Sequence, residues 1–198
     1  MPYPPALLDD LPDRIWPTTE ELKWTAVIEP QQDQKPRVAS TMRIGIISDT
    51  HGLVRPEVTE LLAGVHHIIH AGDIGRPEVI SGLRKIAPVT AIRGNIDRGE
   101  WAAQYLDTAL VKLGGRSFYV LHNLKELDLD PTAAEIDVVV SGHSHRPKIE
   151  TVGGVLYFNP GSAGPRRFTL PIALATLELT GDALWPFIHH IGKMPSRK

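Results

Sequence analysis

Cysteine is absent from this chain of 198 residues. Its absence excludes a disulfide framework, a thiolate zinc site and a cysteine nucleophile. A chain of this length amounts to about one domain, and it can bury a hydrophobic core without covalent cross-links. We therefore expect a single domain that is held together by its packing.

A large excess of charge and long apolar runs are also absent. The formal net charge is -2, whereas proteins that bind nucleic-acid polymers are usually strongly basic. No apolar run reaches the roughly 18 residues of a transmembrane helix. The first residues also lack the basic segment and apolar stretch of a secretory signal. These absences predict a soluble cytoplasmic protein whose partner is neither a membrane nor a nucleic-acid polymer.

Proline is unevenly distributed, because seven of the 17 prolines lie within residues 1–41. Proline at this density blocks a long helix and a central strand. We interpret residues 1–41 as a proline-rich N-terminal extension and residues 42–198 as the domain that carries the function. The extension also contains Trp16 and Trp24, which favour docking on the domain or on a partner.

In the first half of the domain, runs of β-branched and apolar residues alternate with helical patterns. Strands are predicted at 43–48, 65–70 and 88–93, and helices at 56–64 and 76–87. Each predicted helix begins with proline followed by an acidic residue, which is a typical N-terminal signature. This alternation indicates βαβ units with parallel strands.

The second half of the domain is richer in strands. Segments 108–122, 147–159 and 170–190 each read as a hairpin, with turns at Gly114-Gly115, Gly153-Gly154 and Gly181-Asp182. A further strand is predicted at 136–142. We expect an α/β domain in which two sheets pack together.

Side chains that can bind metal recur where the predicted strands end. Ligands bind along this edge in open α/β sheets. A single Gly-Asp or Gly-Asn pair is typical of a turn, but five such elements in one order are not expected by chance. The elements are Asp49-Thr50-His51, Gly72-Asp73, Gly94-Asn95, His122-Asn123 and Gly142-His143-Ser144-His145.

The ligand atoms in this set are oxygen and imidazole nitrogen, without sulfur. Such ligands favour Mn, Fe, Zn or Ni. Seven ligands are too many for one ion with an open position, whereas two ions can share an aspartate through its two oxygens. Two metals about 3.5–4 Å apart clamp a phosphoester, and a hydroxide held by both is the expected nucleophile.

The pattern D-x-H, G-D, G-N, H and G-H-x-H resembles the signature of the calcineurin-like metallophosphoesterase superfamily. The runs HAGDI at 70–74 and NPGSAGPRR at 159–167 resemble its small prokaryotic phosphodiesterase branch. The resemblance covers residues 42–190. It implies two mixed β-sheets sandwiched between helices, a four-layer fold with the site at the strand ends.

The resemblance also implies a role for each matching residue. The first ion would be held by Asp49, His51, Asp73 and His145, and the second by Asp73, Asn95, His122 and His143. Asp73 is thus the bridge between the two ions. Asn95 is also expected to contact a phosphate oxygen, and Asn95 and His51 are the residues expected to act in catalysis.

Two positions depart from the superfamily pattern. Ile96 stands where many members have a histidine that assists the leaving group, so we expect a preference for activated diesters. Asn123 stands where members often have glycine. This departure affects the geometry of the local loop and not the preceding ligand, His122. Asp97 is expected to orient a neighbouring residue rather than bind metal, and His70 is a candidate for supporting Asp73.

The remaining polar residues have structural interpretations. Ser162 is expected to cap backbone groups, because no Ser-His-acid arrangement accompanies it. Arg98 and Arg166 would lie on loops near the site, where guanidinium groups suit phosphate, with surface arginine as the alternative. The other histidines are interpreted as strand and surface residues: His66, His67, His189 and His190.

The leading hypothesis is a phosphodiesterase that needs two divalent metal ions and hydrolyses small phosphoesters by attack of a metal-bridging hydroxide. Manganese is the expected ion, with nickel, iron and zinc as alternatives. A second hypothesis is a non-catalytic interaction scaffold of the same fold, like the retromer subunit that resembles these enzymes. A third is a nuclease, which the balanced charge disfavours. The sequence leaves the formation of a homo-oligomer open.

Overall fold

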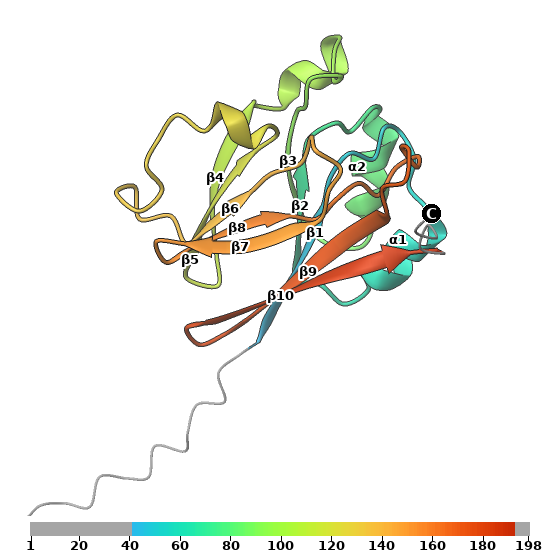
Figure 1. Ribbon diagram of the computed structural model, residues 1–198. Coiled ribbons are helices and arrows are strands. Elements are labelled where there is room, and N and C mark those ends of the chain that lie inside the picture. The colour runs from blue at the N-terminus through green and yellow to red at the C-terminus, as the bar shows by residue number, and fades with distance from the viewer. Residues whose placement is uncertain (1–40, 193–198) are drawn as a thin grey trace, which may run out of the picture. The chain divides into compact units, whose positions relative to one another are not determined.

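The computed structural model describes residues 41–192, which form two five-stranded mixed β-sheets with few helices (Figure 1). The first sheet, in spatial order, consists of β10 (Ala183–Ile191), β9 (Ile172–Thr180), β1 (Met42–Ile47), β2 (His67–Ala71) and β3 (Val89–Ile92). The second consists of β4 (Thr108–Leu113), β5 (Arg116–Leu121), β6 (Val138–Val140), β8 (Val155–Asn159) and β7 (Lys148–Val152). Of the expected extension, only Thr41 lies within the described residues.

Strands β1, β2 and β3 run parallel, and helices α1 (Pro56–Leu61) and α2 (Pro77–Leu83) connect them. The predicted βαβ units are thus confirmed, although both helices end earlier than predicted. After α1, Gly64 has a left-handed conformation with φ 74°, and after α2, Pro88 disfavours helical backbone in the residue before it. No helix within residues 41–192 is long and apolar enough to span a bilayer.

The three predicted hairpins are present in the structure. Their strands are β4 and β5, β7 and β8, and β9 and β10, with turns at the predicted positions. The first glycine of each turn has a positive φ, of 57° at Gly114, 58° at Gly153 and 56° at Gly181. Glycine adopts this conformation at little steric cost, so these residues fix where each hairpin turns.

The main hydrophobic core lies between the two sheets. Strands β1 and β2 contribute Ile44, Ile46 and Ile69 from one side, and β5 and β8 contribute Phe118 and Phe158 from the other. All five side chains are essentially inaccessible to solvent. This core holds the two sheets face to face and thereby fixes the relative positions of their strand ends.

Different elements cover the outer faces of the two sheets. Helices α1 and α2 pack on the first sheet. On the second sheet the cover within the described residues is segment 122–137, whose regular structure is a 3-10 turn, η2 (Leu124–Glu126). Leu127 and Leu129 of this segment pack against the buried Val139. The two mixed sheets are as predicted, while the layer on this side is a loop and not a helix.

The carboxyl ends of the parallel strands in both sheets meet at one edge of the domain. Within the first sheet, the N–H of Asp49 donates to the carbonyl of Gly72 at 3.0 Å. Between the sheets, the N–H of Ala163, which follows β8, donates to the carbonyl of Ser48 at 3.1 Å. The loops that carry the predicted ligands are therefore joined directly to one another.

Candidate metal centre

The predicted ligands lie on these loops, and five of them have a left-handed backbone. The φ angle is 52° at Asp49, 46° at His51, 54° at Asp73, 64° at His143 and 56° at His145. Residues other than glycine rarely adopt this conformation, which costs roughly 1–3 kcal/mol each. Such strain persists where the surrounding structure enforces it, and it is concentrated at functional sites.

Hydrogen bonds and close contacts between loops hold these conformations. The N–H of His51 donates to the carbonyl of Asp73 at 3.0 Å, and the N–H of His143 donates to Oδ2 of Asp49 at 3.1 Å. Gly94 packs directly on the Asp73 loop, where a Cβ would lie 2.2 Å from Oδ1 of Asp73. A glycine is therefore required at this contact.

Asp49, His51 and His145 form a first cluster. Nε2 of His145 lies 3.2 Å from Oδ1 of Asp49 and 3.3 Å from Nε2 of His51. Nε2 of His51 lies 4.0 Å from Oδ1 of Asp49. Ligand atoms around a tetrahedral ion with bonds of about 2.1 Å are roughly 3.4 Å apart. The spacing of the three atoms therefore suits a single ion.

Asp73 and His122 form a second cluster, to which Asp49 also contributes a carboxylate. Nε2 of His122 lies 3.3 Å from Oδ1 of Asp73. On the other side of the ring, Nδ1 donates to the carbonyl of Ala71 at 2.8 Å. This bond selects the tautomer in which Nε2 carries a lone pair, as a metal ligand requires.

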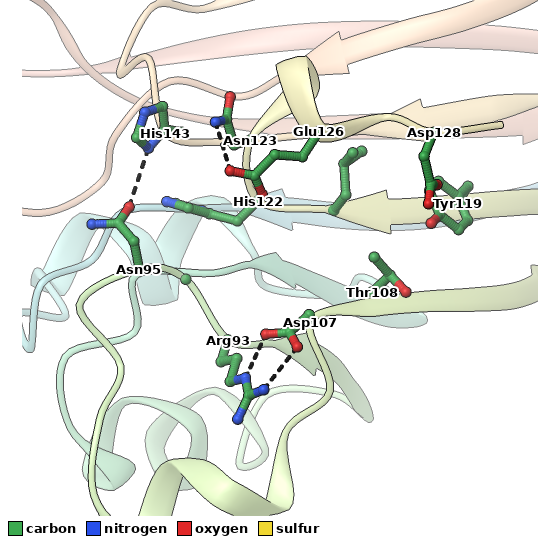
Figure 2. Close-up of a pocket in the computed structure, with 12 residues that line it drawn as sticks. Arg93, Asn95, Asp107, Thr108, Tyr119, His122, Asn123, Glu126, Asp128 and His143 are labelled. Carbon is green, nitrogen blue, oxygen red and sulfur yellow. Dashed lines mark hydrogen bonds and ion pairs between the residues drawn. The ribbon is translucent and has the colours of Figure 1, made fainter.

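Asn95 and His143 lie beside this second cluster (Figure 2). Nδ1 of His143 is 3.2 Å from the amide oxygen of Asn95, and the ring of His143 is 5.3 Å from that of His122. The structure thus brings both side chains, which are distant from His122 in the sequence, next to its ring.

Asp73 lies between the clusters, and its two carboxylate oxygens face different histidines. Oδ2 is 3.9 Å from Nε2 of His51, and Oδ1 is 3.3 Å from Nε2 of His122. The N–H of Ile96 also donates to Oδ1, at 3.1 Å. The side chain is buried, so this orientation is fixed by its surroundings.

The polar atoms of the site fit divalent cations. Oδ1 of Asp49 and Nε2 of His122 are buried and have no hydrogen-bond partner. A buried polar atom left unpaired is costly, and a cation at each cluster would satisfy both atoms. Carboxylate, amide and imidazole donors together suit Mn, Fe, Zn or Ni.

Burial and neighbouring charges shift the pKa values of three site residues. Burial lowers the pKa of His51, and the charge of Arg167 lowers it further, against the attraction of Asp73. Burial raises the pKa of Asp73, but the neighbouring imidazoles of His122 and His51 and the hydrogen bond from the N–H of Ile96 together outweigh it and leave the pKa below its usual value. Burial lowers the pKa of His122, but the nearby carboxylates of Asp73 and Asp49 and the hydrogen bond to the carbonyl of Ala71 together outweigh it, so its pKa is raised. A neutral His51 beside an ionised Asp73 is the state that binds a cation.

Ser48 and Thr50 help to orient the ligands, a role that the sequence analysis did not predict. The hydroxyl of Ser48 donates to Oδ2 of Asp49 at 2.7 Å. The hydroxyl of Thr50 is 2.9 Å from Nε2 of His70. His70 therefore supports the site through Thr50 and not through a direct bond to Asp73. The positions of Ser48 and Thr50 directly beside Asp49 in the sequence were the available signal.

Asp97 orients the ligand loops, as predicted. Its Oδ2 accepts hydrogen bonds from the N–H groups of Ile74 at 3.0 Å and Gly94 at 2.8 Å. Its Oδ1 accepts from the N–H of Gly75 at 2.7 Å. The buried carboxylate thus joins the loop after β2, which carries Asp73, to the loop after β3.

Asn159 and Ser162 support the ligand loops from the end of β8. The amide of Asn159 donates to the carbonyl of Gly142, the residue before His143, at 2.6 Å. The hydroxyl of Ser162 donates to the carbonyl of Asp49 at 2.9 Å. The predicted capping role of Ser162 is confirmed, whereas Asn159 was missed.

The other basic residues within 41–192 lie outside the two clusters. His66, His67 and His189 have hydrogen bonds to backbone or hydroxyl groups of neighbouring strands, as predicted for structural histidines. The charge of Arg167 acts on His51 and lowers its pKa, an effect that the sequence analysis did not predict.

A cavity of about 340 Å³ opens beside the second cluster (Figure 2). Asn95, His122 and His143 line one end of it. The rest of the wall comes from the residues after β3, from β4 and β5, and from the loop after β5. Its polar side chains are Arg93, Asp107, Thr108, Tyr119, Asn123, Glu126 and Asp128. A molecule bound at the second cluster would extend its remaining groups into this cavity.

The sequence matches the calcineurin-like phosphoesterase superfamily domain over residues 42–182. A probable metallophosphoesterase of Methanothermobacter thermautotrophicus is 32% identical over 158 residues, which cover 72% of this chain and 89% of the relative. A phosphodiesterase of Methanocaldococcus jannaschii is 29% identical over 139 residues, which cover 61% of this chain and 83% of the relative. The chain therefore belongs to the calcineurin-like phosphoesterase superfamily.

Solved structures of similar fold agree with this family assignment. A structure described as a novel archaeal phosphodiesterase has a TM-score of 0.64 and 26% identity, over 75% of this chain and 100% of that chain. Vps29 of Chaetomium thermophilum has a TM-score of 0.66 and 21% identity, over 75% of this chain and 88% of that chain. At that identity, the second likeness establishes a shared fold alone.

Proposed function

We propose that the protein is a phosphodiesterase that needs two divalent metal ions and hydrolyses small phosphoesters. The observation that carries this proposal is the position of Asp73, whose two oxygens face His51 and His122 in separate clusters. A carboxylate in that position can bind two cations at once, which is the arrangement of two-metal phosphoester hydrolases. The similarity to an archaeal phosphodiesterase supports the same reaction class.

On this proposal, each cluster holds one ion and Asp73 binds both. The first ion is held by Asp49, His51, Asp73 and His145, and the second by Asp73, Asn95, His122 and His143. Two divalent ions bound there supply Lewis acidity and an activated water for attack at phosphorus. Manganese is the ion that we expect, with nickel, iron and zinc as alternatives.

The chain's own side chains orient the substrate. Asn95 is exposed and lines the cavity, so its amide N–H is placed to donate to a phosphate oxygen. At the first cluster, the charge of Arg167 acts on His51. A guanidinium near this cluster favours the binding of an anionic ester. Ile96 is 40% exposed and cannot donate a proton. We therefore expect diesters whose leaving group needs no protonation to react fastest.

Hydrolysis of bis(4-nitrophenyl) phosphate and of 4-nitrophenyl phosphate tests the proposal. The protein is stripped of metal with a chelator and then given Mn, Ni, Zn or Mg singly. We expect turnover restored by metal and higher for the diester. A preference for the monoester would contradict the argument from Ile96. No hydrolysis with any ion, together with fewer than about one bound ion per chain, would favour a non-catalytic scaffold.

The proposal also specifies where the activity resides. Residues 42–198 form the catalytic domain in the cytoplasm, and residues 1–41 are an extension without a catalytic role. Deletion of residues 1–41 should then leave metal-dependent hydrolysis of the diester in place, measured beside the full chain.

A further inference from the structure

The cavity beside the second cluster extends well beyond the predicted metal ligands (Figure 2). The first-cluster ligands Asp49, His51 and His145 are not among its lining residues. Its volume of about 340 Å³ is at the lower end of the range for small-molecule sites, roughly 300–1,000 Å³. It therefore suits one small group rather than a run of nucleotides.

Three carboxylates and one guanidinium line the cavity. Arg93 forms a bidentate pair with Asp107, with Nη2 at 2.7 Å from Oδ2, so these two charges cancel. Glu126 accepts a hydrogen bond from the amide of Asn123 at 3.0 Å, which leaves its charge in place. Within residues 41–192, Glu126 and Asp128 have no salt bridge to a cationic group. The wall therefore carries two uncompensated negative charges.

The opposite end of the cavity presents an unsatisfied buried group. The side chain of His122 is 7% exposed, and its Nε2 atom has no hydrogen-bond partner. In Figure 2 the ring points toward Asn95 and His143, whereas Tyr119 and Asp128 lie at the end away from His143. A phosphoester held at the second cluster would lie at the His122 end, and a substituent that filled the rest of the cavity would reach the carboxylates.

The chemistry of the wall specifies what such a substituent must be. Ionised carboxylates accept hydrogen bonds and cannot donate them. A substituent that donates hydrogen bonds and carries positive charge is favoured, whereas a second anion is repelled. The ring of Tyr119, on the same part of the wall, adds an aromatic surface of the kind that attracts ammonium groups.

We propose that this cavity binds the second alcohol of a phosphodiester and selects an alcohol that bears an ammonium group over an apolar or an anionic one. The proposal rests on the proposed function, because the phosphate must be held at the second cluster. It adds a substrate class to that function: small diesters of amino alcohols.

A series of diesters with one leaving group tests the selection. Each compound carries 4-nitrophenyl as the leaving group, and the second alcohol is 2-aminoethyl, propyl, glyceryl or 2-carboxyethyl. The aminoethyl and propyl groups have nearly the same shape and differ in charge. Because each exposed carboxylate contributes a modest attraction, we expect kcat/KM for aminoethyl to exceed that for propyl by about fivefold and that for carboxyethyl by more. The aminoethyl advantage should shrink toward unity in 1 M salt, because screening weakens charge but not shape.

A double variant and a matched control locate the effect. Glu126→Gln with Asp128→Asn keeps the shape of the wall and removes both charges, and it should bring the ratio of aminoethyl to propyl close to one. Glu60→Gln removes an exposed acidic residue of α1 outside the cavity, and it should leave the ratio as in the wild type. A double variant that keeps the fivefold ratio would overturn the proposal.

Binding without turnover provides a readout that is independent of hydrolysis. We expect 2-aminoethyl methylphosphonate, added to the full chain, to shift the amide NMR signals of Asn123, Glu126 and Asp128 more than propyl methylphosphonate does. Equal kcat/KM for aminoethyl and propyl, or a glyceryl diester that matches aminoethyl, would overturn the selection for charge and leave the phosphodiesterase proposal intact. If no diester is hydrolysed at all, the proposed function fails, and the NMR comparison alone decides for or against the cavity.

Discussion

The hydroxyl oxygen of Thr50 lies 2.9 Å from Nε2 of His70, and neither residue is accessible to solvent. Because that hydroxyl donates its own hydrogen to the carbonyl of Ile74 at 3.0 Å, His70 donates through Nε2–H. Nδ1 on the other side of the ring is buried without a partner, and burial favours the neutral imidazole. The hydrogen bonds among His70, Thr50 and Ile74 connect the loop of Asp49 to the loop of Asp73.

The neutral state of His70 makes stability depend on pH. Burial lowers the pKa of His70 from 6.5 to about 4 in the folded protein. Between those two values the unfolded chain binds more protons than the folded chain does. The contribution of the neutral His70 to the free energy of unfolding is therefore fully present above pH 6.5 and is lost as the pH falls toward 4. We expect this residue to reduce the free energy of unfolding by up to about 3 kcal/mol across that window.

Urea denaturation of the metal-free protein between pH 4 and 7 measures this effect. His70→Gln keeps an N–H donor for Thr50 but does not titrate, so its stability should change less over the window than that of the wild type. His190→Gln alters an exposed histidine of β10 and should follow the wild-type curve. Parallel curves for His70→Gln and the wild type would contradict the assignment.

Asp97 is predicted to control metal affinity from outside the ligand set. In Asp97→Asn one acceptor oxygen becomes an N–H₂ group, which leaves at least one of the three backbone donors at Ile74, Gly75 and Gly94 unpaired. The two loops that Asp97 joins then lose their fixed spacing. We expect a loss of roughly 10–100-fold in Mn affinity, measured by isothermal titration calorimetry.

The control for that experiment is a partly buried aspartate that also joins two segments but lies far from the site. Asp137 accepts hydrogen bonds from the N–H of Ser117 at 2.7 Å and from Arg116 at 2.9 Å, at the amino-terminal ends of β5 and β6. Asp137→Asn should lower the melting temperature but leave Mn affinity within about twofold. A similar loss of affinity in both variants would mean that general destabilisation explains the result at Asp97.

The sequence predicted the fold well where the local signals were strong. The glycine turns at 114, 153 and 181 placed all three hairpins, because each turn needs a positive φ. The alternation of strands and helices placed β1, β2 and β3 in parallel. The ends of α1 and α2 were predicted less well, because tertiary packing and the following residues decide where a short helix ends.

The candidate site could be predicted as a set of residues but not as a geometry. All seven predicted ligands lie together, because each follows a strand that ends at the same edge. The pairing of Thr50 with His70, and the support of Gly142 by Asn159, depend on contacts between distant segments that no spacing reveals. The loop that covers the second sheet was also missed, since its apolar residues follow no regular period.

Asp73 should be the least replaceable residue for activity. Asp73→Asn keeps one oxygen and loses the second, so the side chain can no longer face both His51 and His122 with an anionic oxygen. We expect a folded protein with at least ~100-fold lower kcat/KM for bis(4-nitrophenyl) phosphate, and fewer bound Mn ions per chain by elemental analysis. Near-normal turnover would contradict the bridging role.

Gly94 permits the close contact that positions Asp73, and substitution by alanine tests it directly. A Cβ at this position would lie 2.2 Å from Oδ1 and 2.3 Å from the backbone nitrogen of Asp73, so the Asp73 loop must move away. We expect Gly94→Ala to lose Mn binding while the circular dichroism of the sheets persists. Gly82→Ala, in α2, meets no atom within 4 Å and should stabilise the protein by about 0.5–1 kcal/mol, because alanine favours the helix. If Gly94→Ala bound Mn as tightly as Gly82→Ala, the contact between Gly94 and Asp73 would not be what holds the carboxylate between the two clusters.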